Sequence, residues 1–214
     1  MAAQRTTRQI RADDTRRRLF AAAAELFAAH GYHDTTVDQI AKLAGVAKGT
    51  FFVHFATKDA VVAELVRHQV RAARRARALA LAEGGTPIQA LVAAVTKLGE
   101  EAGASRPLSR AVMAALLENP ELSGYADAVF GELLADMRQD IRAARRARLL
   151  QPTANVDSVA DTLIATYLGA ALYFTSSPRA KPLLELLRPL LEANLAGFRG
   201  ARAKPRKRWR SRMV

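Results

Sequence analysis

Alanine and leucine dominate the 214-residue sequence, and no long stretch alternates apolar and polar residues as a half-buried β-strand would. Runs of β-branched residues are short, whereas apolar residues recur with the three-to-four-residue period of an amphipathic helix. Hydrophobic residues make up 50% of the chain, which is enough to bury a core. The sequence therefore predicts an all-α protein, and its pattern indicates about nine helices.

Capping residues and helix breakers predict where these helices begin and end. Thr36 is followed three residues later by Gln39, which is a capping-box pattern, and Gly45 ends this short helix. Thr57 can cap a longer helix that runs to about Glu83. The other expected boundaries are a cap at Asp13, Asp14 or Thr15, a stop at His30-Gly31, a cap and first turn at Thr86-Pro87, and breaks at Asn119-Pro120, Gln151-Pro152 and Ser177-Pro178.

The second and third expected helices have the pattern of a helix-turn-helix. Ala41 is small where two helices must approach closely, and Gly45 stands where a positive φ lets the chain turn sharply. A helix that begins near Ala47 could then lie across a DNA major groove, with its N-terminal side chains facing the base edges. Lys48 can donate to guanine O6 and N7, and Thr50 can bond a base edge or contact a thymine methyl.

Positive charge is concentrated at the two ends of the chain. The sequence has 33 Lys and Arg against 20 Asp and Glu, a formal net charge of +13. The first 18 residues contain six arginines and two aspartates, and the last 16 contain eight basic residues and no acidic one, so the middle is almost neutral. This balance favours a partner with many negative charges, and double-stranded DNA is the first candidate. We therefore expect a flexible basic arm (1–14), a helix-turn-helix domain (15–60), a larger helical domain (61–198) and a disordered basic tail (199–214).

Residues 15–66 resemble the DNA-binding domain of the TetR family of transcriptional repressors. The residues that carry the resemblance are Ala24-Glu25-Leu26-Phe27, Gly31-Tyr32, Thr35-Thr36-Val37, Ile40-Ala41, Ala44-Gly45-Val46, Lys48-Gly49-Thr50-Phe51-Phe52, His54-Phe55 and Lys58-Asp59-Ala60. This match covers about a quarter of the chain. The resemblance implies that the larger helical domain dimerises and often binds a small molecule, and that DNA is released when it does.

The resemblance also assigns roles to single positions. Phe52 falls where an aromatic ring packs on the DNA backbone, His54 where a ring meets phosphate, and Lys58 where a lysine clamps a phosphate. The family commonly has tyrosines at positions 52 and 53, where this chain has Phe52 and Val53, so a phenolic hydroxyl is missing. The residues expected to bind DNA are Thr36, Lys48, Gly49, Thr50, Phe52, His54 and Lys58.

The middle helices must supply any effector pocket. Pockets are largely apolar with few polar groups, and helical cores have the same composition, so the sequence alone leaves both readings open. The candidate contacts are Leu98, Met113, Leu116, Leu117, Tyr125, Phe130, Met137, Tyr167 and Phe174. We expect a small, mainly apolar effector.

The last two expected helices, about 155–176 and 180–198, carry wide apolar faces. One chain can bury only part of these faces, so we expect two chains to form a four-helix bundle; the alternative is that each chain packs them internally. The expected interface residues are Leu163, Tyr167, Ala170, Leu183, Leu187, Leu190 and Leu191. A twofold dimer should bind a near-palindromic operator with half-sites about 34–36 Å apart, or a multiple of that spacing.

The leading hypothesis is a ligand-responsive repressor, and the alternative is a helical protein that coats DNA through its basic ends without sequence choice. An enzyme is third, because the sequence has no phosphate loop, no G-x-G-x-x-G and no H-E-x-x-H motif, so we expect no catalytic residues and no cofactor. His30 and His33 are three residues apart, but Gly31 ends the helix between them and we expect no metal site. No apolar run is long enough to span a membrane, and the absence of cysteine fits a cytoplasmic protein.

Overall fold

The computed structural model describes residues 6–199, and every regular element in that range is an α-helix. The fold class predicted from the sequence is confirmed. The nine helices of the described range are α1 (Thr7–His30), α2 (Val37–Leu43), α3 (Lys48–His54), α4 (Lys58–Ala82), α5 (Pro87–Gly103), α6 (Arg106–Glu118), α7 (Pro120–Arg146), α8 (Val156–Ser176) and α9 (Leu183–Phe198). None of them is both long and apolar enough to cross a membrane.

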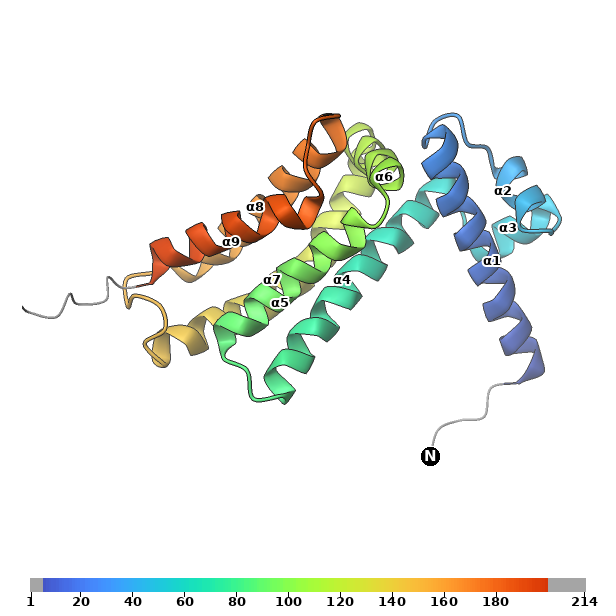
Figure 1. Ribbon diagram of the computed structural model, residues 1–214. Coiled ribbons are helices and arrows are strands. Elements are labelled where there is room, and N and C mark those ends of the chain that lie inside the picture. The colour runs from blue at the N-terminus through green and yellow to red at the C-terminus, as the bar shows by residue number, and fades with distance from the viewer. Residues whose placement is uncertain (1–5, 200–214) are drawn as a thin grey trace, which may run out of the picture.

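The helices form a small unit at one end of the molecule and a larger bundle at the other (Figure 1). α1, α2 and α3 make up the small unit, and α4 leads from it into the bundle of α5 to α9. α4 packs on α5 and α7, α9 packs on α5 and α8, and α6 packs on α1. One continuous hydrophobic core joins both parts. A movement of helices in the bundle can therefore be transmitted to the small unit through contacting side chains.

Local capping accounts for most helix boundaries. The Thr36 hydroxyl accepts from the backbone N–H of Gln39, and the Gln39 side chain accepts from the backbone N–H of Thr36. Thr57 caps α4 through the N–H of Ala60, and Asn119 begins α7. These boundaries agree with the sequence prediction. One break was not predicted: Ala104 ends α5, and Ser105 caps a separate α6.

The start of α1 differs from the prediction. Thr6 and Gln9 form a capping box, so the helix begins at Thr7 rather than near Asp13. The residues from Thr7 to Asp14 are helical and exposed, so the prediction of a flexible arm is wrong for them. Arginine is a good helix former, and a run of basic residues does not by itself end a helix. The predicted basic tail, apart from Arg199, lies outside the described residues, as do residues 1–5.

Candidate functional site

The turn between α2 and α3 fixes a helix-turn-helix. Gly45 has a φ of 66°, a left-handed conformation that favours glycine, and its N–H bonds to the carbonyl of Lys42 at 3.1 Å. Ile40 and Phe51 are completely buried between the helices. Packing of these two side chains sets the angle at which α3 leaves the turn, with its other face directed to solvent.

That outer face of α3 is polar at its N-terminus and apolar farther along. Lys48 and Gly49 are exposed, and no atom lies within 4 Å of where a Gly49 Cβ would stand, so another molecule can approach the backbone closely. Phe52 and Val53 are 50% and 80% exposed. Val53 was not among the predicted DNA contacts, although its position two residues after the buried Phe51 on a helix was a signal that it would face outward. Apolar side chains of this kind can contact thymine methyl groups.

Lys48 is held by an ion pair in the free protein. Its Nζ lies 2.7 Å from Oδ2 of Asp38 on α2, and both side chains are more than half exposed. Exposed ion pairs contribute only about 0–1 kcal/mol, so a base edge can compete with Asp38 for the ammonium group. Thr50 and His54 are half-buried, and Thr36 is exposed while its hydroxyl caps α2.

The ammonium group of the half-buried Lys58 is directed toward the loop before α2. Its Nζ donates to the backbone carbonyls of Tyr32 at 2.6 Å, Thr35 at 2.9 Å and His33 at 3.4 Å. The ammonium group also lies 4.1 Å from the centre of the Tyr32 ring. Burial lowers the pKa of Lys58, although the charge of Asp34 opposes this. The phosphate role stays a prediction, and in this conformation the N–H donors of Lys58 hold the loop before α2.

A second feature lies inside the helical bundle. A cavity of about 40 Å³ is lined by side chains from α4, α5, α6, α7 and α8. Its lining residues are Val66, Gln69, Ala102, Ser109, Val112, Met113, Leu116, Phe130, Tyr167, Leu168, Ala171 and Thr175. None of these side chains is ionisable at neutral pH, so the cavity suits a neutral, mainly apolar molecule.

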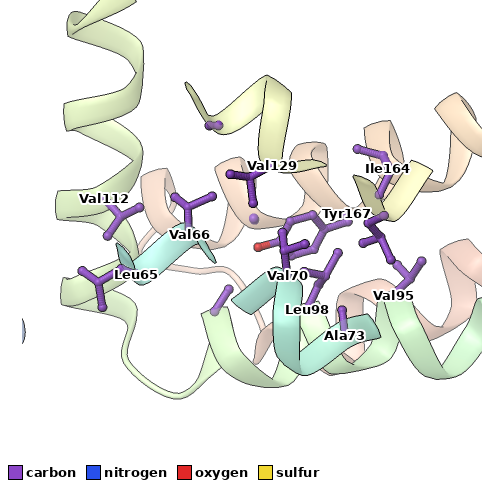
Figure 2. Close-up of a cluster of buried hydrophobic side chains, with 14 of the residues drawn as sticks. Leu65, Val66, Val70, Ala73, Val95, Leu98, Val112, Val129, Ile164 and Tyr167 are labelled. Atoms are coloured by element: carbon purple, nitrogen blue, oxygen red, sulfur yellow. The ribbon is translucent and has the colours of Figure 1, made fainter. Parts of the chain in front are cut away.

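Tyr167 is one of the polar side chains that line this cavity. Figure 2 shows its ring and hydroxyl among aliphatic side chains such as Val66, Val70 and Val129. The side chain is 4% exposed. Burial raises the pKa of Tyr167 well above its ordinary value of 10, so the hydroxyl stays protonated and can donate. A protonated hydroxyl at this cavity can donate a hydrogen bond to a ligand oxygen.

The predicted effector residues divide into those that reach this cavity and those that do not. Met113, Leu116, Phe130 and Tyr167 line it together. The other predicted residues do not line this cavity, for reasons of packing, and their effector role stays a prediction. Leu98, Met137 and Phe174 are packed in the core, Leu117 is 72% exposed, and Tyr125 bonds to Arg67.

The histidines considered as metal ligands have other surroundings. His33 Nε2 lies 2.5 Å from Oε2 of Glu118 on α6. Among residues 6–199, no group of three or more His, Cys, Asp or Glu side chains is placed to hold a metal ion.

Comparison with known proteins bears on both the helix-turn-helix and the cavity in the bundle. Residues 19–65 match the family model described as bacterial regulatory proteins, tetR family. The HTH-type transcriptional regulator UidR of Escherichia coli K12 is 27% identical over 162 residues, which is 75% of this chain and 82% of that protein. The crystal structure of Thermus thermophilus FadR, a TetR-family transcriptional repressor in complex with lauroyl-CoA, is 28% identical with a TM-score of 0.69, over 88% of this chain and 98% of that one. The resemblance to the TetR family of transcriptional regulators is confirmed for residues 19–65, which are a DNA-binding domain of that family.

The chain is thus a ligand-responsive DNA-binding regulator rather than a protein that coats DNA without sequence choice. The fold agrees over most of the chain. The regulator FadR from Bacillus subtilis, in complex with stearoyl-CoA, superposes with a TM-score of 0.74 over 85% of this chain and 98% of that one, at 20% identity. The relatives named above are transcriptional regulators rather than enzymes.

The regulator packs most of its predicted dimer interface inside one protomer. Those residues are at most 6% exposed: Leu163, Tyr167, Ala170, Leu183, Leu187 and Leu191. The prediction is wrong for these six, because α9 turns its leucines onto α5 and α8. Leu190 is 46% exposed and stays a candidate.

A different apolar face of the regulator is open. The exposed residues of α8 include Ala165, Leu168, Gly169, Leu172 and Tyr173, which lie on one side of the helix. No atom of the described protein lies within 4 Å of where a Gly169 Cβ would stand. On α9, Leu190, Ala193 and Gly197 are exposed. This surface, which we call the α8/α9 face, is the apolar area available to a second chain.

Proposed function

We propose that the protein is a repressor that binds a near-palindromic operator as a dimer and is released by a small, mainly apolar effector. It would act on chromosomal DNA in the cytoplasm. The observation that carries the proposal is the exposed face of α3, which offers Lys48, Gly49, Phe52 and Val53 at the end of the molecule away from the bundle. A short helix with this face fits the width of a major groove.

Base choice on this proposal comes from the N-terminal end of α3. Lys48 would exchange Asp38 for guanine O6 and N7, and Thr50 would contact the neighbouring base. Phe52 and Val53 would contact thymine methyl groups or sugar. Thr36 and His54 would contact the DNA backbone, which fixes register without reading sequence.

The dimer would form through the α8/α9 face. Two copies of an exposed apolar helix pair bury each other in a twofold arrangement, and Gly169 allows close approach. This arrangement gives the two copies of α3 a fixed separation, which is why a near-palindrome is expected.

The effector would occupy an enlarged form of the cavity beside Tyr167. At about 40 Å³ the cavity holds a water-sized group, whereas ligand pockets span about 300–1,000 Å³, so binding requires Met113, Leu116 or Phe130 to move. The two FadR structures contain acyl-CoA molecules, and a hydrocarbon chain suits the apolar lining of this cavity. Movement of these side chains would shift α6 and α7 and release DNA.

Selection of bound duplexes from random DNA at physiological salt tests the DNA-binding half of the proposal. We expect a consensus with twofold symmetry. Binding without any recovered consensus, or a consensus without symmetry, would contradict it.

A thermal-unfolding titration with lauroyl-CoA tests the effector half. We expect a rise in the unfolding midpoint for the native chain and a much smaller rise for Leu116→Trp, which fills the cavity. Leu117→Trp is the matched control, because Leu117 is exposed and outside the cavity. No shift for the native chain, or equal shifts for both variants, would exclude an acyl chain at this place.

A further inference from the structure

Glu64 joins three arginines where the helix-turn-helix unit meets the bundle. Its Oε2 lies 2.7 Å from Arg67 Nη1 and 3.4 Å from Arg16 Nη2, and its Oε1 lies 2.7 Å from Arg71 Nη2. The Glu64 side chain is only 17% exposed. A carboxylate in this position is bound from both sides of the junction, since Arg16 belongs to α1 and the other two arginines to α4.

Arg16 connects this carboxylate to the recognition helix. Its Nη1 donates to the backbone carbonyl of His54, the last residue of α3, at 2.6 Å. Its guanidinium carbon lies 4.3 Å from the centre of the Phe55 ring. A cation at the C-terminus of a helix is favourable, because the unpaired carbonyls there carry partial negative charge. Arg16 thus holds the end of α3, and Glu64 holds Arg16.

Arg67 connects the same carboxylate to α7. Its Nη2 donates to the hydroxyl of Tyr125, and its guanidinium carbon lies 5.2 Å from the centre of that ring. Tyr125 lies five residues before Phe130, which lines the effector cavity on the same helix. A displacement of Phe130 that moves α7 therefore moves the group that Arg67 binds.

The junction also has room for such a displacement. A crevice of about 410 Å³ lies between the helix-turn-helix unit and the start of α7, and all four linked side chains, from Arg16, Glu64, Arg67 and Tyr125, border it. Packed interfaces shift between discrete arrangements when space permits.

We propose that Arg16, Glu64, Arg67 and Tyr125 form a relay that sets the position of the recognition helix according to the position of α7. This inference rests on the proposed function, because the relay matters only if α3 reads DNA and the bundle responds to an effector. The four are positioning residues: none of them is expected to contact DNA bases or the effector.

Hydrogen–deuterium exchange of the free, full-length protein tests the relay without DNA or effector. In Tyr125→Phe and in Glu64→Gln, we expect the amides of residues 51–55 to exchange about fivefold faster than in the native chain. The double variant should exchange no faster than the faster single variant, because both break one chain of contacts. Glu83→Gln, at the exposed end of α4, is the matched control and should leave α3 unchanged.

The amides of α8 and α9 serve as an internal reference in every variant. If Glu64→Gln fails to fold, Arg67→Lys paired with Tyr125→Phe replaces it. Unchanged exchange in α3 for Tyr125→Phe, or effects that multiply in the double variant, would overturn the relay and leave the proposed function intact. Loss of a symmetric consensus in the DNA selection would instead overturn the proposed function.

Discussion

At the scale of single residues, two lysines with similar places in the sequence motif have opposite tasks. Lys48 faces outward and its ammonium group pairs with the exposed carboxylate of Asp38. Another partner can displace this carboxylate. Lys58 faces inward and binds three backbone carbonyls. The difference lies in what each side chain can reach: Lys58 begins α4 beside the loop that follows α1, and that loop offers unpaired carbonyls.

Lys58→Ala tests the inward role. The carbonyls of Tyr32 and Thr35 lose their donor, so we expect the free energy of unfolding to fall by about 1–3 kcal/mol, measured by urea unfolding. Lys42→Ala, at an exposed position on α2, is the control and should change little. A phosphate contact predicts a different result, namely unchanged stability and a DNA-binding salt dependence that is weaker by about one phosphate contact.

The pH dependence of stability tests the Glu64 carboxylate. Burial raises the pKa of Glu64, but the hydrogen bond from Arg71 and the charges of Arg71, Arg67 and Arg16 lower it by more, so it lies below its ordinary value of 4.5. A lowered pKa means that the stabilising contribution is complete above pH 4.5 and is lost as the pH falls below it. We expect the difference in unfolding midpoint between the native chain and Glu64→Gln to shrink as the pH falls from 6 toward 3. A difference that does not vary with pH in this range would contradict the ionised assignment.

At the scale of helices, α4 and α7 are joined by charged pairs along their length. Arg74 binds Glu132 and Asp136, and one turn farther Arg77 Nε lies 2.5 Å from Asp140 Oδ2. The Arg77 and Asp140 side chains are only 13% and 6% exposed. Buried pairs fix the relative position of two helices, because each partner is costly to leave alone.

Asp140→Asn tests this link. It leaves Arg77 largely buried without its opposite charge, so we expect the free energy of unfolding to fall by about 3 kcal/mol in a urea titration. Asp157→Asn is the matched control, because Asp157 is 68% exposed in its pair with Arg138 and should change stability by less than about 1 kcal/mol. Similar losses for the two variants would show that burial does not set the strength of the pair.

The helix boundaries were largely predictable, because caps are local signals. Thr36, Thr57 and Asn119 each satisfy backbone N–H groups two or three residues ahead, which the sequence displays directly. The partners of a helix face are not local. Gly99 lets α9 approach α5 so closely that an added Cβ would lie 2.7 Å from Leu187 Cδ2, and the leucines of α9 are buried there rather than in a dimer.

The candidate site shows the same limit. The outward position of Lys48 followed from the helix-turn-helix pattern, whereas the inward position of Lys58 depends on carbonyls that lie 23 to 26 residues earlier in the sequence. Tyr125 was a reasonable effector contact by composition, but Arg67 lies 58 residues away and could not be paired with it from the sequence. Contacts of this range are set by the packing of α1, α4 and α7 rather than by a local pattern.

At the scale of the whole molecule, the proposed DNA-reading surface and the proposed effector cavity lie in different parts that one continuous core joins. α3 stands at one end of the molecule, and the cavity lies within the bundle at the other (Figure 1). α4 runs from the unit that contains α3 into the bundle and contributes to the lining of the cavity. A second chain on the α8/α9 face would make two copies of α3 act together, so oligomeric state and DNA recognition are linked.

Leu172→Glu tests the dimer. Leu172 is 47% exposed on the α8/α9 face, and a charge there would be buried against the partner. We expect sedimentation to show a dimer for the native chain and a monomer for the variant, with a folded helical spectrum in both. Leu79→Glu is the control at another exposed apolar position, 59% exposed on α4. A native chain that stays monomeric at micromolar concentration would contradict the dimer.

The most direct measurement of the central claim replaces single guanines of the selected duplex by 7-deazaguanine, which lacks the N7 acceptor. Affinities are measured by fluorescence anisotropy for the native chain and for Lys48→Ala. If α3 reads the major groove, one position in each half-site should weaken binding by the native chain, by about 1 kcal/mol or more, and should have no effect on Lys48→Ala. Equal losses in both proteins at every position, or no loss at any position, would show that Lys48 on α3 does not read guanine in the groove.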